Sequence, residues 1–148
     1  MPNTQKRKGF TLIEVLLVIV IIAILAGIVL IAINPGRQVS QANNAQRSSD
    51  VNALLNAIHQ YSIDNRGALP ADITTTAGVI DSTAIDICAD LVPTYMAGLP
   101  TDPTDADATY TDCATAYDTG YTVIQDANGR VTVSAPSAEL SETISVTR

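Results

Sequence analysis

Hydrophobic residues are concentrated in one unbroken run near the N-terminus. Residues 15–33 contain no charged and no polar side chain. At ~1.5 Å per residue, this run of nineteen residues makes about 29 Å of α-helix, close to the ~30 Å hydrocarbon thickness of a bilayer. The pattern therefore predicts one membrane-spanning helix.

A cleaved secretory signal is the alternative interpretation of this run. Such a signal has a basic start, an apolar stretch of ~7–15 residues and a cleavage site made of small residues. The run is longer than that, and the sequence Ile31-Ala32-Ile33-Asn34 is a poor cleavage site, so we favour a retained span. The basic residues Lys6, Arg7 and Lys8 precede it, which predicts an N-terminus in the cytoplasm and a body on the other side of the membrane.

The pattern changes at Asn34-Pro35-Gly36, where proline removes a backbone donor and disfavours helix at the preceding residue. We expect a kink within one long helix here; a helix end followed by a linker is the alternative. Residues 39–61 are amphipathic, with an apolar stripe at i, i+3, i+4 and i+7, and a helix end is predicted at Gly67. The stripe consists of Val51, Leu54, Leu55 and Ile58, and the predicted polar face includes Asn44, Arg47 and Asp50.

The rest of the chain is polar and shows short alternating segments. Residues 121–125, 130–134 and 143–147 have the period of strands, the first two joined by an Asn-Gly turn, and 85–91 is a candidate short helix. These patterns predict an α+β fold in which a long N-terminal helix packs on a small antiparallel sheet of about three strands. The predicted organisation is a leader at 1–9, the apolar half of the helix at 10–36, its amphipathic half at 37–66 and a body at 67–148.

Composition and charge exclude several functional classes. The chain has 148 residues and a pI near 4.3, and the part beyond residue 9 has five Arg, fifteen acidic residues and no Lys, a formal charge of −10. This balance argues against a nucleic-acid partner. The sequence shows no nucleophile motif and no phosphate-binding loop, so we expect no enzyme activity.

Two cysteines, Cys88 and Cys113, fall in the part of the chain expected outside the cytoplasm. In an oxidising compartment a disulfide between them would stabilise the fold by roughly 3–4 kcal/mol on the chain-entropy model. Two buried free thiols are the alternative. We predict the disulfide.

Glu14 is an acidic residue at the inner edge of the apolar run, where an ionised carboxylate needs water or a partner. If the chain is cut between Gly9 and Phe10, the new α-amino group lies one helical turn from this carboxylate. The segment from Lys8 to Glu14, followed by the apolar run, resembles the class III leader of type IV pilins and type II secretion pseudopilins.

The resemblance implies that prepilin peptidase cleaves after Gly9 on the cytoplasmic side and that Phe10 is then N-methylated. The new amine at Phe10 carries the charge that neutralises Glu14, either within the same chain or from a neighbouring copy, and in a filament the second pairing would set the axial register. The expected function is a structural subunit of a type IV pilus-like filament; the alternatives are a pseudopilin of type II secretion and a membrane-anchored binding module that does not polymerise. The expected partners are further copies of the chain, the peptidase, inner-membrane assembly proteins and the lipid bilayer.

An acidic loop provides the one candidate for a metal site. The resemblance to major pseudopilins implies calcium in a C-terminal loop, but the spacing is not that of an EF-hand and no Glu closes the loop. We therefore favour a solvated loop without a cofactor over a calcium site. The candidate ligands are Asp102, Asp105, Asp107 and Asp112.

Overall fold

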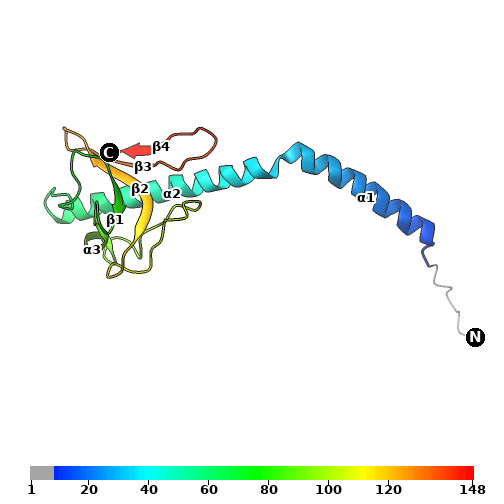
Figure 1. The fold of residues 1–148 in the computed structure, drawn as a ribbon, viewed down its shortest axis with the longest axis horizontal. Coiled ribbons are helices and arrows are strands. Elements are labelled where there is room, and N and C mark those ends of the chain that lie inside the picture. The colour runs from blue at the N-terminus through cyan, green and yellow to red at the C-terminus, as the bar shows by residue number, and fades with distance from the viewer. Residues whose placement is uncertain (1–8) are drawn as a thin grey trace, which may run out of the picture. The chain divides into compact units, whose positions relative to one another are not determined.

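The computed structural model describes residues 9–148 and divides after Gln38 into two compact units. The predicted leader, except Gly9, lies outside the described residues, and so do Lys6, Arg7 and Lys8. The first unit contains helix α1, and the second contains most of helix α2, a short helix α3 and strands β1 to β4 (Figure 1).

Helix α1 spans Leu12–Ile33, and all of its side chains are exposed in the isolated chain. It confirms the predicted apolar helix. The helix ends at Asn34, which adopts a left-handed conformation with φ 47° and accepts a hydrogen bond from the Arg37 amide at 3.4 Å. Pro35 then begins the next helix, so the predicted break is present as a left-handed residue between two helices.

Helix α2 spans Pro35–Asp64 and carries the predicted apolar stripe into the core. Its end agrees with the sequence, because Gly67 has φ 92° and its amide donates to the carbonyl of Ser62 at 2.7 Å. The four stripe residues, Val51, Leu54, Leu55 and Ile58, are fully buried.

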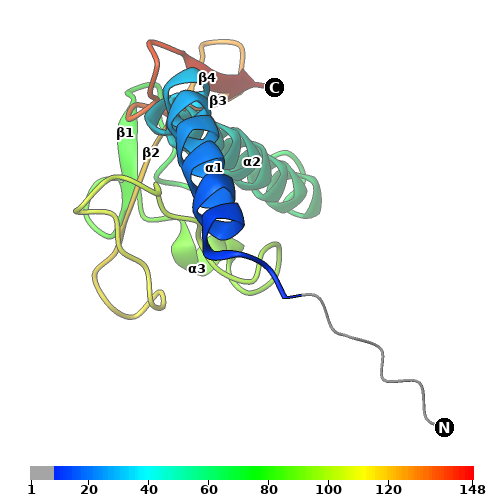
Figure 2. The same cartoon turned by 90° about the vertical axis from the view of Figure 1, so that its right-hand side faces the viewer.

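A four-stranded antiparallel sheet in the order β1-β2-β3-β4 covers this stripe (Figure 1 and Figure 2). Val123 pairs with Val133 across β2 and β3, and both side chains are fully buried in the core beneath α2. The strands are β1 (Gly78–Asp81), β2 (Asp118–Gln125), β3 (Val131–Ala135) and β4 (Ile144–Thr147).

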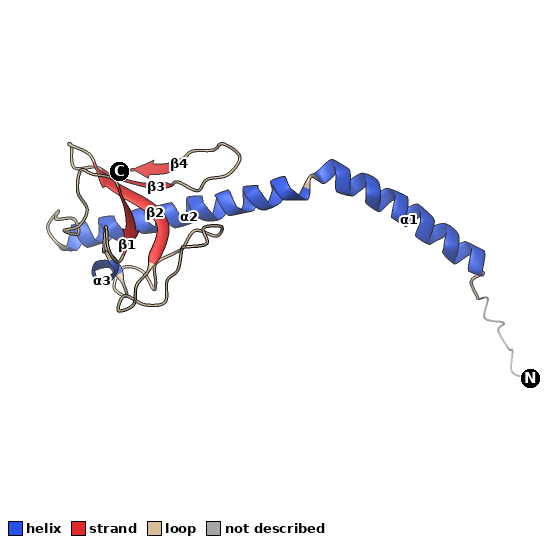
Figure 3. Cartoon of the chain, viewed as in Figure 1, coloured by secondary structure: helices blue, strands red, loops and turns tan. Residues whose placement is uncertain are grey.

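The structure corrects the predicted body at three points. Strand β1 was not predicted, because its four residues are too few to show a period and pair only with distant β2. The short helix is only one turn, α3 at Cys88–Leu91, and loops fill much of the remaining body (Figure 3). The third correction concerns α2, because Asn44, Arg47 and Asp50 are buried and not on an exposed polar face.

Candidate functional site

The segment around the predicted cleavage point is extended and then enters α1. Gly9 and Phe10 lie outside the helix, and the Phe10 side chain is 83% exposed. Thr11 caps the helix with extended backbone (φ −79°, ψ 151°). The candidate cleavage bond is therefore accessible and not held in a helix.

Thr11 and Glu14 form a capping box at the start of α1. The Glu14 amide donates to the Thr11 hydroxyl at 3.3 Å, and the Thr11 amide donates to Oε2 of Glu14 at 3.5 Å. Two backbone N–H groups that α1 cannot pair are thereby satisfied. Sequence reasoning assigned no function to Thr11, although the Thr-x-x-Glu spacing is the signal that identifies such a cap.

Beside this cap, α1 presents an apolar surface with one carboxylate at its edge. Phe10, Glu14, Val15, Val18 and Ile19 line a surface hollow of about 320 Å³. Helix α1 has the length and composition to cross a membrane. This surface can therefore lie in lipid or against another apolar helix.

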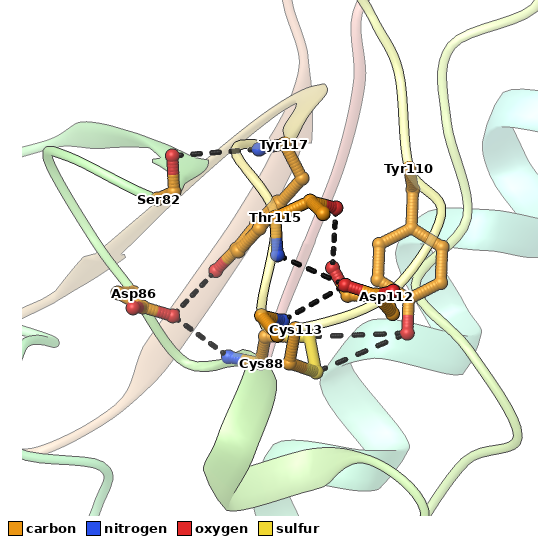
Figure 4. Close-up of a disulfide and its surroundings, with 9 residues drawn as sticks. Ser82, Asp86, Cys88, Tyr110, Asp112, Cys113, Thr115 and Tyr117 are labelled. Carbon is orange, nitrogen blue, oxygen red and sulfur yellow. Dashed lines mark hydrogen bonds between the residues drawn. A yellow bond between two sulfur atoms is a disulfide. The ribbon is translucent and has the colours of Figure 1, made fainter.

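The predicted disulfide between Cys88 and Cys113 is present, with the two Cα atoms 5.5 Å apart. The Tyr110 hydroxyl lies 3.9 Å from each sulfur (Figure 4). Asp86 links Tyr117 to the backbone of Cys88, because it accepts from the Tyr117 hydroxyl at 2.8 Å and from the Cys88 amide at 3.3 Å. Burial, followed by the hydrogen bond to Asp86, raises the pKa of Tyr117.

The structure does not gather the four candidate calcium ligands into one site. Asp105 accepts from the Asp107 amide at 3.0 Å, and Asp112 accepts from the amides of residues 114 and 115. Asp102 pairs with Arg47. Within residues 9–148, no group of three or more His, Cys, Asp or Glu side chains is placed to hold a metal ion. The favoured solvated loop, and the alternative of a calcium site, both stay predictions.

Arg47 is the centre of a buried polar cluster that sequence reasoning missed. Its guanidinium binds Asp102 through two hydrogen bonds, Nε to Oδ2 at 2.7 Å and Nη2 to Oδ1 at 3.0 Å. Its Nη1 donates to Glu139 at 2.9 Å and to Asn44 at 3.0 Å. Both side chains of the Arg47–Asp102 pair are fully buried.

A second buried carboxylate, Asp50, lies one turn further along α2. It accepts from the Tyr121 hydroxyl at 2.8 Å and from the Gln46 amide group at 2.8 Å. Burial raises the pKa of Asp50, and these hydrogen bonds lower it by less. Asp102 behaves in the opposite way: burial raises its pKa, but the hydrogen bonds from Arg47 and from Thr104 outweigh burial and leave the pKa lowered.

Comparison with known proteins agrees with the geometry of the N-terminal segment. Residues 4–30 match the family model described as the prokaryotic N-terminal methylation motif. The chain is similar to type II secretion system core protein G of Escherichia coli K12, with 40% identity over 65 residues. That match covers 44% of this chain and 43% of the E. coli protein, so the chain spans less than half of that relative.

Another relative is matched over most of its length. Type II secretion system core protein G of Klebsiella pneumoniae is 30% identical over 105 residues, which cover 70% of this chain and 73% of that protein. No solved structure matches the chain significantly. The methylation motif, the exposed apolar helix with its early glutamate and the extended similarity to core protein G together show that this chain belongs to the type IV pilin and type II secretion pseudopilin family.

Proposed function

We propose that this chain is a structural subunit of a type IV pilus-like filament. It is inserted in the inner membrane through α1, cleaved after Gly9 and methylated on the Phe10 amine. It then leaves the membrane and polymerises through α1. Membership of the pilin and pseudopilin family supports this function.

The observation that carries the proposal is that every residue of an apolar helix is exposed. Within the described chain no residue of α1 is buried, although its residues from Val15 to Ile33 are all apolar. Such a helix has no stable place in water, so it requires lipid or other copies of the same helix. A filament subunit needs both environments, the first for storage and the second for assembly.

Glu14 can specify how neighbouring copies of α1 align, which a purely apolar surface does not. Its carboxylate lies at the edge of the hollow next to Phe10, at the start of α1. When the helix bundles, this carboxylate is desolvated and requires a positive partner. The amine created at Phe10 of a neighbouring copy supplies that charge, and the pair fixes the axial register more than it adds net stability.

The similarity to relatives named type II secretion system core protein G favours a pseudopilin as the second candidate. In that case the filament is a short secretion pseudopilus and not a surface fibre. Both candidates share the same partners, namely further copies of the chain, prepilin peptidase and inner-membrane assembly proteins. They also share a cytoplasmic N-terminus and a body outside the inner membrane.

The proposal is tested with Glu14→Gln and a matched control, Asp72→Asn, which makes the same charge change at an exposed position in the body. We expect both variants to be inserted in the membrane and cleaved. Sheared filaments should be recovered from the control and not from Glu14→Gln, because an amide does not attract the neighbour's amine. Mass spectrometry of wild-type filaments should find subunits that begin at Phe10 and carry one added methyl group.

Normal filament yield from Glu14→Gln would contradict the role of the carboxylate. Filaments whose subunits still begin at Met1 would contradict processing. A membrane-anchored module that never polymerises would leave no filaments in either preparation. Electron microscopy of the sheared material then separates long surface fibres from short pseudopili.

A further inference from the structure

The feature that carries a further inference is the buried Arg47 cluster, which joins two distant loops to α2. One loop contributes Asp102 and Thr104, whose hydroxyl also accepts from Arg47. The other loop, between β3 and β4, contributes Glu139. Asp102 lies 55 positions from Arg47 along the chain, and Glu139 lies 92 positions from it. The cluster therefore fixes tertiary structure and not local structure.

The loop between β3 and β4 is held by further side chains of α2. Ser40 donates to Oε1 of Glu139 at 2.8 Å and Asn43 to Oε2 at 2.9 Å. Asn44 binds the backbone of Glu139 in both directions, accepting from its amide at 2.9 Å and donating to its carbonyl at 2.9 Å. Asn44 also donates to Glu142 at 3.1 Å. Arg47 therefore pairs with two carboxylates, Asp102 and Glu139, and uncharged side chains of α2 supply the remaining contacts to this loop.

The acidic loop is the place where the family resemblance implies calcium, and the chemistry of Asp102 does not fit that metal. Oδ2 accepts from Arg47, and Oδ1 accepts from Arg47, from the amide and hydroxyl of Thr104 and from the amide of Asp105. Both oxygens are surrounded by donors. A calcium ion at this carboxylate would also lie against a guanidinium charge in a region of low dielectric constant.

We infer that the Arg47 guanidinium is a built-in counter-ion that takes the place of a structural metal ion in this body. It neutralises Asp102 and Glu139 and pins residues 99–107 and 136–142 to α2. The folded body is therefore independent of calcium. This inference concerns the single subunit and does not rest on polymerisation.

The first test measures thermal unfolding of the full chain, purified in detergent, in calcium chloride and in chelator. We expect the unfolding temperature to be the same in both, because no ligand-linked stabilisation is present. A rise in calcium of several degrees would overturn the inference. Failure of the subunit to form filaments would contradict the proposed function and leave this result unchanged, so the two failures are distinguishable.

The second test replaces the counter-ion and compares Arg47→Met with Arg130→Met. Arg130 pairs with Asp126 at 2.8 Å, but its side chain is 62% exposed, so it is a matched control for loss of an ion pair. Loss of the buried pair should lower the unfolding temperature by about 10 °C or more, whereas the control should change it little. Equal unfolding temperatures in the two variants would overturn the inference.

Arg47→Lys keeps the test valid if Arg47→Met does not fold. Lysine retains the charge but cannot bind Asp102 through two parallel hydrogen bonds. Hydrogen exchange should therefore become faster in residues 99–107 and 136–142, with less change in β2. Uniformly faster exchange across β2 and both loops, or no change in the loops, would contradict a local clamp.

Discussion

Two buried aspartates in the body should respond to the same substitution with opposite dependence on pH. Asp102 is ion-paired with Arg47, and Asp50 is hydrogen-bonded to uncharged groups, Tyr121 and Gln46. The pKa of Asp102 is lowered in the folded state, and the pKa of Asp50 is raised. Asp102→Asn and Asp50→Asn therefore remove charges that have opposite effects on the free energy of unfolding.

The sign of each effect on the free energy of unfolding follows from proton linkage. A carboxyl with a lowered pKa contributes stability above its unfolded pKa of 3.8, and this stability is lost as the pH falls through the folded pKa. A carboxyl with a raised pKa contributes most below 3.8, and its contribution is lost as the pH rises through the folded pKa. Asp102→Asn should thus be most harmful at neutral pH and less harmful in acid. Asp50→Asn should preserve or increase stability at neutral pH.

The expected loss of unfolding free energy for Asp102→Asn follows from the burial of the Arg47–Asp102 pair. Breaking one side of a buried ion pair costs about 3–5 kcal/mol. The low end applies because asparagine retains one acceptor oxygen and because Arg47 keeps Glu139, whose side chain is 30% exposed. With a urea m-value of about 1.5 kcal/mol/M, a loss of about 3 kcal/mol lowers the unfolding midpoint by about 2 M.

Urea unfolding of the full chain in detergent, followed by near-ultraviolet circular dichroism, measures both variants. The chain has five tyrosines and no tryptophan, so the signal reports mainly on the body. Titrations at pH 7 and near pH 3 give the change in unfolding free energy for each variant. An equal loss of unfolding free energy for Asp102→Asn at both values of pH would refute the proposed linkage, and so would a larger loss for Asp50→Asn than for Asp102→Asn at pH 7.

Three further predictions concern the fold. Replacing Cys88 and Cys113 together by serine should cost roughly 3 kcal/mol, and the wild type with reductant should show the same midpoint in urea. Leu54→Ala, in the fully buried stripe, should cost about 2–5 kcal/mol, whereas Val18→Ala, 49% exposed in α1, should leave unfolding of the body unchanged. Gly129→Ala forces a side chain into φ 84° in the β2–β3 turn and should cost about 1 kcal/mol, read from the same denaturation curves.

The elements with a repeated local pattern could be predicted from the sequence. The apolar run gives α1, the stripe gives the buried face of α2, and the alternating segments give β2, β3 and β4. Strand β1 could not be predicted, because four residues do not establish a period and its pairing with β2 spans about forty residues. The disulfide could be anticipated from the predicted compartment.

The processing segment could also be predicted, because its signal is a contiguous motif. Gly9, Phe10 and Glu14 stand within six residues and precede an apolar run, and residues 4–30 match the methylation motif. The Arg47 cluster has no such signal. Its partners lie fifty-five and ninety-two positions away, so no spacing along the chain identifies them.

The polar face assigned to α2 was wrong for a reason that extends beyond this one helix. Asn44, Arg47 and Asp50 continue the direction of the apolar stripe towards the start of α2. Loops supply the partners of Asn44 and Arg47, and Tyr121 of β2 donates to Asp50. A periodicity rule sorts residues by hydrophobicity and therefore places a buried arginine on the exposed face. Burial of such residues is recognised only when the partners that satisfy them are known.

The order of residues along the two helices has a physical consequence for a chain that enters a membrane. Apolar residues end at Ile33, a polar zone from Ser40 to Asp50 follows, and the buried apolar stripe begins at Val51. Asn34, Arg37 and Gln38 also lie between the apolar run and this zone, so the hydrophobic surface of α1 does not continue into the stripe. Moving Arg47 to the centre of the hydrocarbon would cost about 2.5–3.5 kcal/mol and would also break its bonds to Asp102 and Glu139. The buried polar cluster therefore makes insertion of this part of α2 into lipid unfavourable while it holds the body together, which an apolar core at the same position would not do.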